Sequence, residues 1–167
     1  MDIELRRTSE ADLPDVMALW NDGRVMAFVG FPNGLGATPE SMRAWLGRLE
    51  ADASRRHFSI HAPGIGFCGE AYYAIDADHD LATLDIKLRP EAQGRGIASA
   101  ALSQVLSEIF DGGLAGRAYV DPSHHNAPAL RLYERLGFVE AVRPPWLDDP
   151  APDAMYFEIT PETVRRP

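Results

Sequence analysis

The chain has 167 residues, with 16 Lys and Arg against 25 Asp and Glu, so its formal net charge is −9. Cys68 is the single cysteine, which excludes an intrachain disulfide and a cysteine-rich metal site. The acidic balance argues against a nucleic-acid partner, and no apolar run approaches the ~20 residues that cross a bilayer. We therefore expect a cytoplasmic protein that folds as one domain over residues 1–167, with no membrane attachment.

The first third of the chain predicts a strand, a loop and two helices. Ile3 and Leu5 alternate with polar residues, and a helix is expected to begin near Pro14. The stretch FVGFPNGLGATPE predicts a loop, and Thr38 followed by Pro39 predicts the start of a second helix. The loop beside these helices is either a substrate flap or a plain connector.

The remaining two thirds alternate between strand and helix patterns. Period-two alternation predicts three strands in succession, and helical spacing predicts two helices, the second closed by Gly137. We expect an α/β or α+β fold with one mixed sheet. The expected elements are strands near 57–61, 67–75, 84–88, 118–120, 138–142 and 155–159, and helices over 97–109 and 129–136.

The clearest local signal is LDIKLRPEAQGRGIASAAL, where a strand, a glycine loop and a helix follow one another. Gly94 and Gly96 permit positive φ, so successive backbone N–H groups can face one anion. The helix start near Ile97 adds unpaired N–H groups and partial positive charge, and Arg95 adds a cation. This pattern predicts a pyrophosphate cradle. A tight turn with glycine used only for geometry is the alternative.

Two dinucleotide-binding patterns in the chain are incomplete or misplaced. Gly94 and Gly96 begin a G-x-G-x-x-G pattern, but Ser99 stands at its third glycine. The segment Gly64–Gly69 matches the pattern in full, yet a strand pattern follows it where a helix start is required. A nicotinamide-dependent oxidoreductase is therefore disfavoured.

A second group of residues lies in YVDPSHHNAPALRLYERLGF. Asn126 and Tyr133 are seven residues apart on an expected helix, which places them on nearly one face about 10 Å apart along the axis. An amide and a phenol would thus line one extended ligand. The alternatives are a helix cap for Asn126 and a core aromatic for Tyr133.

Together these residues resemble the GNAT superfamily of acetyl-CoA-dependent N-acetyltransferases. The family loop Gln/Arg-x-x-Gly-x-Gly/Ala is met by Gln93, Gly96 and Ala98. The segment RPEAQGRGIA is similar to the corresponding segment in the family branch that contains ribosomal-protein N-terminal and aminoglycoside acetyltransferases. The second family signature is met by Asn126, Ala129, Leu132, Tyr133, Gly137 and Phe138.

The resemblance implies a splayed sheet, flanked by about four helices, with CoA wedged into the gap. The backbone of Ile86, Lys87 and Leu88 would pair with the pantetheine arm, and Asn126 would bond it. The Leu88 N–H would be an oxyanion donor, and Tyr133 would act as acid to the CoA thiolate. The pyrophosphate would lie on the N–H groups of Gln93, Gly94, Arg95, Gly96, Ile97 and Ala98, together with Ser99.

The sequence indicates the general base less clearly than it indicates the donor-binding residues. A lysine-like amine with a pKa of about 10.4 lies ~3.4 units from neutrality at pH 7, so a base is useful. Glu70 is expected first, then Asp85 and Asp121, because all three lie on strands that could face the acceptor cleft. Each is equally readable as a solvated strand carboxylate, and a water chain is the alternative base.

The expected function is direct transfer of an acetyl group from acetyl-CoA to a primary amine, either a small molecule or a protein N-terminus. A non-catalytic CoA-binding sensor or interaction module is the alternative. The oligomeric state is left open between a monomer and a homodimer.

No metal is expected, because the adjacent His124 and His125 have no carboxylate or cysteine at ligand spacing. Cys68 is expected in the core rather than as an acyl carrier.

Overall fold

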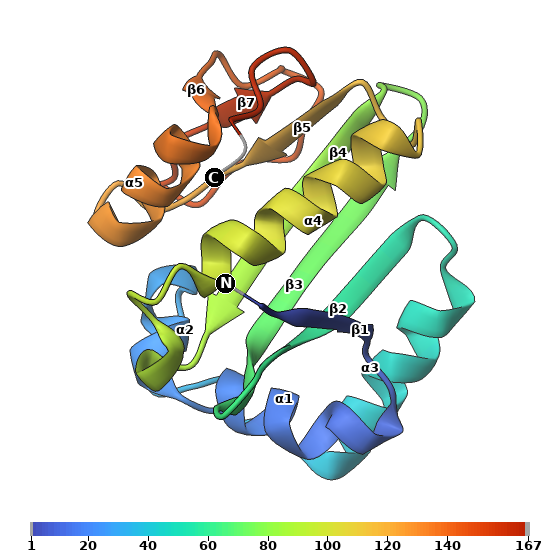
Figure 1. Ribbon diagram of the computed structural model, residues 1–167, viewed down its shortest axis with the longest axis vertical. Coiled ribbons are helices and arrows are strands. Elements are labelled where there is room, and N and C mark those ends of the chain that lie inside the picture. The colour runs from blue at the N-terminus through green and yellow to red at the C-terminus, as the bar shows by residue number, and fades with distance from the viewer. Residues whose placement is uncertain (1, 166–167) are drawn as a thin grey trace.

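The computed structural model describes residues 2–165. Their strands form one mixed sheet in the order β1-β2-β3-β4-β5-β7-β6, which confirms the expected α/β class (Figure 1). All neighbouring pairs are antiparallel except β4 and β5, which run parallel. The strands are β1 (Glu4–Arg7), β2 (Arg55–Ala62), β3 (Gly66–Asp76), β4 (Leu81–Leu88), β5 (Arg117–Val120), β6 (Val139–Glu140) and β7 (Phe157–Ile159).

The helices begin and end largely where their capping residues predict. The Thr38 hydroxyl accepts a hydrogen bond from the Ser41 N–H, and Gly137 closes the last helix with a φ of 102°. The single-turn helix α2 and three 3-10 turns are too short to leave a periodic pattern, and the sequence did not indicate them. The helices are α1 (Leu13–Trp20), α2 (Gly23–Met26), α3 (Pro39–Ala51), α4 (Ile97–Asp111) and α5 (Ala127–Leu136).

The two faces of the sheet carry different side chains. Helices α4 and α5 pack on one face, where alternate strand residues such as Ala71 and Tyr73 join the main hydrophobic core. The other face is covered by α1 and α3, whose apolar residues form a second core with Phe67. On that face Glu70 and Lys87 are paired across β3 and β4, and so are Tyr72 and Asp85. Polar residues therefore occupy a largely covered surface of the sheet.

The sheet opens between its two parallel strands. β4 and β5 pair over three positions, from Leu81 with Arg117 to Thr83 with Tyr119. β4 then continues to Leu88, whereas β5 ends at Val120, and the two strands diverge (Figure 1). The expected splay is confirmed, and it leaves one edge of β4 without a strand partner from Leu84 onward.

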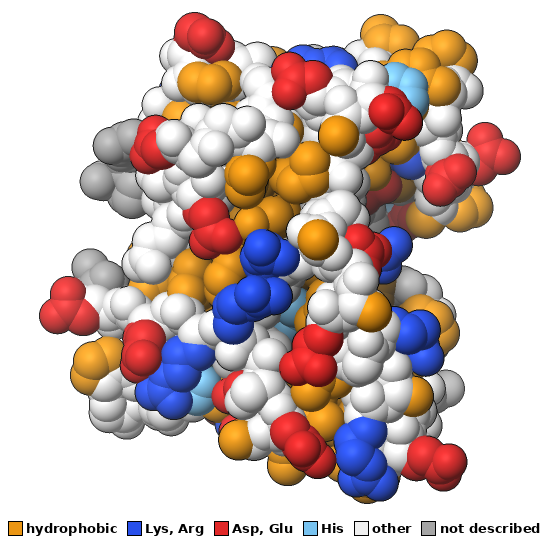
Figure 2. Space-filling view, turned by 90° about the vertical axis from the view of Figure 1, so that its right-hand side faces the viewer, with side chains coloured by type: hydrophobic (Ala, Val, Ile, Leu, Met, Phe, Trp, Pro, Cys, Tyr) orange, Lys and Arg blue, Asp and Glu red, His pale blue; other side chains and the backbone are white. Residues whose placement is uncertain are grey.

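The helices and the surface charges can be compared with those of membrane-spanning and nucleic-acid-binding proteins. Within residues 2–165, no helix combines the length and apolarity needed to cross a membrane. Figure 2 shows acidic side chains scattered over one face of the molecule with a small Lys and Arg group near its centre, rather than a continuous basic band. That face lacks the basic stripe typical of nucleic-acid binding.

Candidate active site

A cleft of about 1180 Å³ opens where β4 and β5 diverge. Its walls are the free edge of β4, the glycine loop before α4, the loop after β5, and one side of α5. The structure therefore brings together at one cavity the two groups of residues that the sequence singled out. The expected ligand residues among its lining are Ile86, Lys87, Leu88, Gln93, Gly94, Gly96, Ile97, Ala98, Ser99, Asn126 and Tyr133.

The glycine loop has the backbone conformation of an anion-binding turn. Gly94 and Gly96 have φ values of 72° and 79°, the left-handed region that favours glycine. Gly96 is also the N-cap of the 15-residue helix α4, and no side chain caps that end. The first N–H groups of α4 thus lack a side-chain acceptor and line the cleft, where the helix dipole adds positive potential. Arg95, expected as a screening cation, is exposed and is not part of the cleft lining.

Replacing Gly96 by alanine tests this loop directly. A Cβ at Gly96 meets no atom within 4 Å, so the substitution costs only backbone strain, about 1–2 kcal/mol, and adds a methyl group at the loop. We expect the KM for acetyl-CoA to rise about tenfold, measured by release of free thiol.

Gly113 provides the matched control, because it has a φ of 64°, also meets no atom within 4 Å, and follows the opposite end of α4. The Gly113→Ala variant should lose similar stability in thermal unfolding and keep its KM. Equal KM values for the two variants would rule out a ligand at the Gly96 turn.

The free edge of β4 presents backbone groups to the cleft. The Ile86 N–H is directed away from β3 and donates to the Asp85 Oδ1 over 2.8 Å. Because N–H groups alternate between the two edges of a strand, the Leu88 N–H faces the same side, and the Gln93 Nε2 donates to the Leu88 carbonyl over 3.2 Å. Lys87, expected to pair with pantetheine as well, directs its backbone toward β3 by the same alternation. Two of the three expected residues, Ile86 and Leu88, therefore direct their backbone groups toward the cleft, where side chains of Asp85 and Gln93 bond two of these groups.

Asn126 and Tyr133 both lie along α5, as expected from their spacing. Asn126 is the N-cap, and its Oδ1 accepts the Ala129 N–H over 3.2 Å, so its amide NH₂ takes no part in the cap, and the residue lines the cleft. Tyr133 is 5% exposed, packs edge-on against Phe138, and lines the cleft. Its hydroxyl makes no hydrogen bond to any described residue. Burial, and then the charges of Asp85 and Asp121, raise the pKa of Tyr133 above its ordinary value, so the phenol keeps its proton.

Glu70, the first-ranked base, is saturated with hydrogen bonds. Its side chain accepts the Trp20 Nε1–H at 2.8 Å and contacts the His57 Nε2 at 2.8 Å and the Lys87 Nζ at 3.4 Å. Burial alone would raise its pKa, but the His57 hydrogen bond, the Lys87 charge and the Trp20 N–H lower the pKa of Glu70 to about 2. A fully bonded carboxylate of such low proton affinity is a poor base. This environment favours a structural role. Both Asp85 oxygens are engaged as well, by the Ile86 N–H and the Lys87 ammonium, but the Asp85 side chain is 44% exposed against 4% for Glu70, so an amine or water can reach it and it is the better candidate.

The Glu70 network predicts a pH dependence of stability. Because the pKa of Glu70 is lower in the folded chain than its usual 4.5, its contribution is complete above that pH and is lost as the pH falls toward about 2. Glu70→Gln should lower the free energy of unfolding in urea by about 1–2 kcal/mol near pH 7. The deficit should shrink as the pH falls from about 4.5 toward 2. A deficit independent of pH would contradict the ion pairing.

Asp85 lies where two cavities meet. A second cavity of about 430 Å³ opens on the α1 and α3 face, and Tyr72, Asp85 and Lys87 line both it and the main cleft. The Asp85 side chain is 44% exposed, and its Oδ2 contacts the Lys87 ammonium. Burial would lower the pKa of Lys87, but the Asp85 and Glu70 carboxylates outweigh it and raise that pKa, so Lys87 remains a cation. An amine in the second cavity would thus meet Asp85 beside the main cleft.

Other side chains also line the site. Trp20 and Trp45 pack against the second core and line the second cavity with their rings 4.8 Å apart. The buried His57 lines it as well and bonds Glu70. Asp121, the third base candidate, lines the main cleft and pairs with Arg143 at 3.3 Å. Strand alternation alone places Glu70 with Tyr72 and Asp85 with Lys87 on common faces of their strands, and this was the missed signal. The register then pairs Glu70 with Lys87 and Tyr72 with Asp85.

Comparison with known proteins decides the family. A model of the acetyltransferase (GNAT) domain matches residues 2–139. The chain belongs to the GNAT acetyltransferase family. Acetyl-CoA is therefore the acyl donor of this GNAT acetyltransferase, as its resemblance at the glycine loop implied. A search of curated protein sequences finds no match.

Solved structures show that the GNAT fold extends over nearly the whole chain. The spermidine N-acetyltransferase from Vibrio cholerae, in complex with CoA and spermine, has a TM-score of 0.82 at 22% identity, covering 96% of each chain. The aminoglycoside acetyltransferase AAC(6')-Ib, in complex with coenzyme A, has a TM-score of 0.77 at 19% identity, covering 97% of this chain and 96% of the other. At these identities the likeness is one of fold.

Proposed function

We propose that this GNAT acetyltransferase transfers the acetyl group of acetyl-CoA directly to the nitrogen of a primary amine. The observation that carries the proposal is the junction of the two cavities. The glycine loop, the free edge of β4 and Tyr133 share the main cleft, and Asp85 connects that cleft to the second, aromatic-lined cavity. Donor and acceptor thus meet without an intervening nucleophilic side chain. Cys68 fits this reading, because it is fully buried and burial raises the pKa of its thiol.

The donor is oriented by the backbone. The diphosphate lies on the N–H groups of the Gly94–Ser99 turn, and the pantetheine arm extends along β4 beside Ile86 and Leu88, with Asn126 opposite. This places the thioester near the splay, where the Leu88 N–H stabilises the oxyanion of the tetrahedral intermediate.

The acceptor enters as an ammonium and must lose a proton before it attacks. Asp85 accepts that proton, directly or through water, and the neutral nitrogen then bonds to the acetyl carbon. The nitrogen is cationic after this attack and loses its remaining extra proton to water. When the C–S bond breaks, the sulfur leaves as a thiolate and the neutral amide is formed. Because the pKa of the Tyr133 phenol is raised whereas a thiol titrates near 8.5, Tyr133 donates a hydrogen bond to the thiolate rather than its proton.

The charge balance of the second cavity bears on the acceptor. Glu70 and Asp85 are both engaged by Lys87, and Asp52 pairs with Arg55 at 2.9 Å. The three carboxylates that line this cavity, Asp52, Glu70 and Asp85, are matched by three cations, Arg48, Arg55 and Lys87, so little net negative charge is left to attract a polycation. Trp20, Trp45 and Tyr72 supply apolar surface instead. We propose a monoamine with an apolar or aromatic body as the acceptor, in place of the polyamine bound by the Vibrio cholerae structure.

Thiol release from acetyl-CoA, measured across a panel of amines, tests both parts of this proposal. Arylalkyl monoamines should give the highest kcat/KM, above spermidine and an aminoglycoside. A preference for spermidine would refute the acceptor class and keep the reaction. Tight CoA binding in calorimetry with no turnover on any amine would instead support a CoA-binding sensor.

A further inference from the structure

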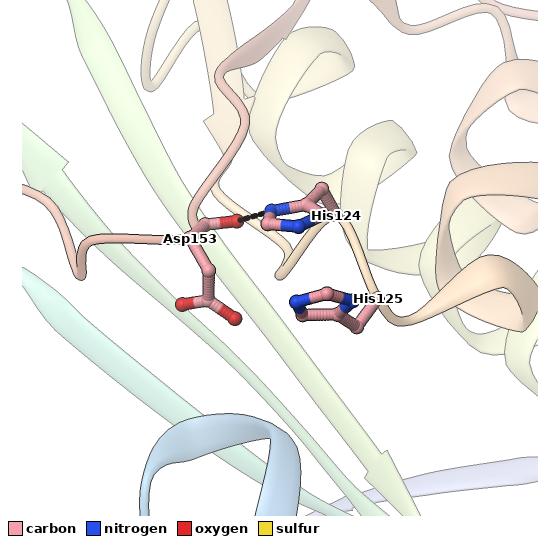
Figure 3. A group of neighbouring side chains, drawn as sticks. All are labelled: His124, His125 and Asp153. Carbon is pink, nitrogen blue, oxygen red and sulfur yellow. Dashed lines mark hydrogen bonds between the residues drawn. The ribbon is translucent and has the colours of Figure 1, made fainter.

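Two loops meet beside the main cleft at His124, His125 and Asp153. Figure 3 shows the His125 ring facing the Asp153 carboxylate, with the His124 ring next to it. Candidate ligand atoms of the three side chains lie within 4.8 Å of one another. Asp153 is distant in sequence from the two histidines, so their spacing alone did not reveal a shared carboxylate.

Backbone pairing holds these loops together. Ser123 and Ala154 form an isolated antiparallel bridge. The His124 N–H donates to the Asp153 carbonyl over 2.8 Å, and the Met155 N–H donates to the Pro122 carbonyl over 2.8 Å. The three side chains therefore project from a paired segment with a defined backbone, although both histidines are exposed.

The hydrogen bonds leave ligand atoms free. The His124 Nδ1 lies 2.9 Å from the Asp153 carbonyl, which can only accept, so Nδ1 carries a proton and Nε2 is the ring nitrogen with the lone pair in the neutral imidazole. Histidines that bind metals commonly donate their other N–H to a backbone carbonyl in this way. The Ser123 hydroxyl donates to the Asp153 Oδ2, which orients the carboxylate and leaves Oδ1 for a second contact.

We propose that His124, His125 and Asp153 bind one divalent transition-metal ion of the Zn²⁺ class. Two imidazoles and a carboxylate are the ligand types of three-residue zinc sites, which leave a fourth position for water. Ligand atoms around tetrahedral zinc lie about 3.4 Å apart, so the exposed side chains close on the ion by small rotations. The site lies outside the proposed catalytic groups. It joins the Asn126-bearing loop of the cleft wall to the segment before β7.

Cobalt and zinc titrations of tag-free protein test the site. We expect one Co²⁺ per chain, with the visible absorption of a four-coordinate ion, and a rise in Tm with Zn²⁺. His125→Ala and Asp153→Ala should each weaken the affinity for Zn²⁺ at least about tenfold. His79→Ala is the control, because His79 is also an exposed histidine beside a carboxylate, with its Nδ1 2.7 Å from Asp76, but it lacks a second imidazole.

Each outcome of the titrations either supports or overturns the metal site. Loss of affinity in both cluster variants, with the control at wild-type affinity, supports the site. Absence of Co²⁺ absorption in the wild-type protein overturns it. So does undiminished affinity in His125→Ala or Asp153→Ala, because the ion would then be bound elsewhere. These readouts need no amine acceptor and are independent of acetyl transfer.

Discussion

Asp85→Asn is expected to lower kcat/KM for the amine about 100-fold near pH 7, the largest effect we anticipate. Asparagine keeps the size of the side chain and cannot take a proton. At higher pH the acceptor is already neutral and needs no base, so the deficit should shrink as the pH approaches the pKa of the amine. Thiol release followed from about pH 7 to pH 10 measures both effects.

Two other carboxylates serve as controls for Asp85. Asp121 lines the same cleft and pairs with Arg143, so Asp121→Asn should change kcat/KM by no more than about threefold. Glu70→Gln should likewise remain within a few fold, because Glu70 is engaged by Trp20, His57 and Lys87. If Glu70→Gln carries the large, pH-dependent loss instead, the base is Glu70. An Asp85→Asn deficit that is constant with pH would show that Asp85 only positions the amine.

Tyr133→Phe should lower kcat by about 10- to 100-fold and leave the KM for acetyl-CoA nearly unchanged. The lost interaction is a hydrogen bond to a charged group, worth about 1.5–3 kcal/mol, and it forms only as the thiolate leaves. The phenylalanine ring preserves the packing against Phe138. Steady-state kinetics with acetyl-CoA varied at saturating amine makes the measurement.

Tyr73 is the matched control for Tyr133. It is a buried tyrosine that packs on the α4 face, and its hydroxyl donates to the Glu108 Oε1 over 2.7 Å. Tyr73→Phe should cost stability in urea unfolding and leave kcat unchanged. A parallel rise in KM in Tyr133→Phe would assign the Tyr133 hydroxyl to donor binding rather than to the departing sulfur.

The predictable parts of this fold carry local chemical signals. Thr38 and Pro39 mark the start of α3 because a hydroxyl cap and a missing N–H both suit a first turn. Gly96 and Gly137 mark helix boundaries because each has a positive φ. The same local logic placed Asn126 and Tyr133 on one helix. In each of these cases, the identity and spacing of residues within one element are enough to predict the feature.

The parts that escaped prediction depend on distant contacts. Glu70 is a strand carboxylate in sequence, and its partners Trp20, His57 and Lys87 come from three other elements. The lowering of the pKa of Glu70 to about 2 becomes evident only when these partners are placed around it in the folded chain. Asp153 approaches His125 through a two-loop bridge that has no periodic pattern. Such groups need the register of the whole sheet before their chemistry can be assigned.

The position of β7 between β5 and β6 has a consequence for synthesis. β7 spans Phe157–Ile159, so the strand that pairs with β5 is synthesised after the other strands of this sheet. Until then β5 has an unpaired edge that can add a strand from another chain. Nascent molecules truncated before Phe157 should therefore aggregate, because this edge of β5 stays open until β7 has been made.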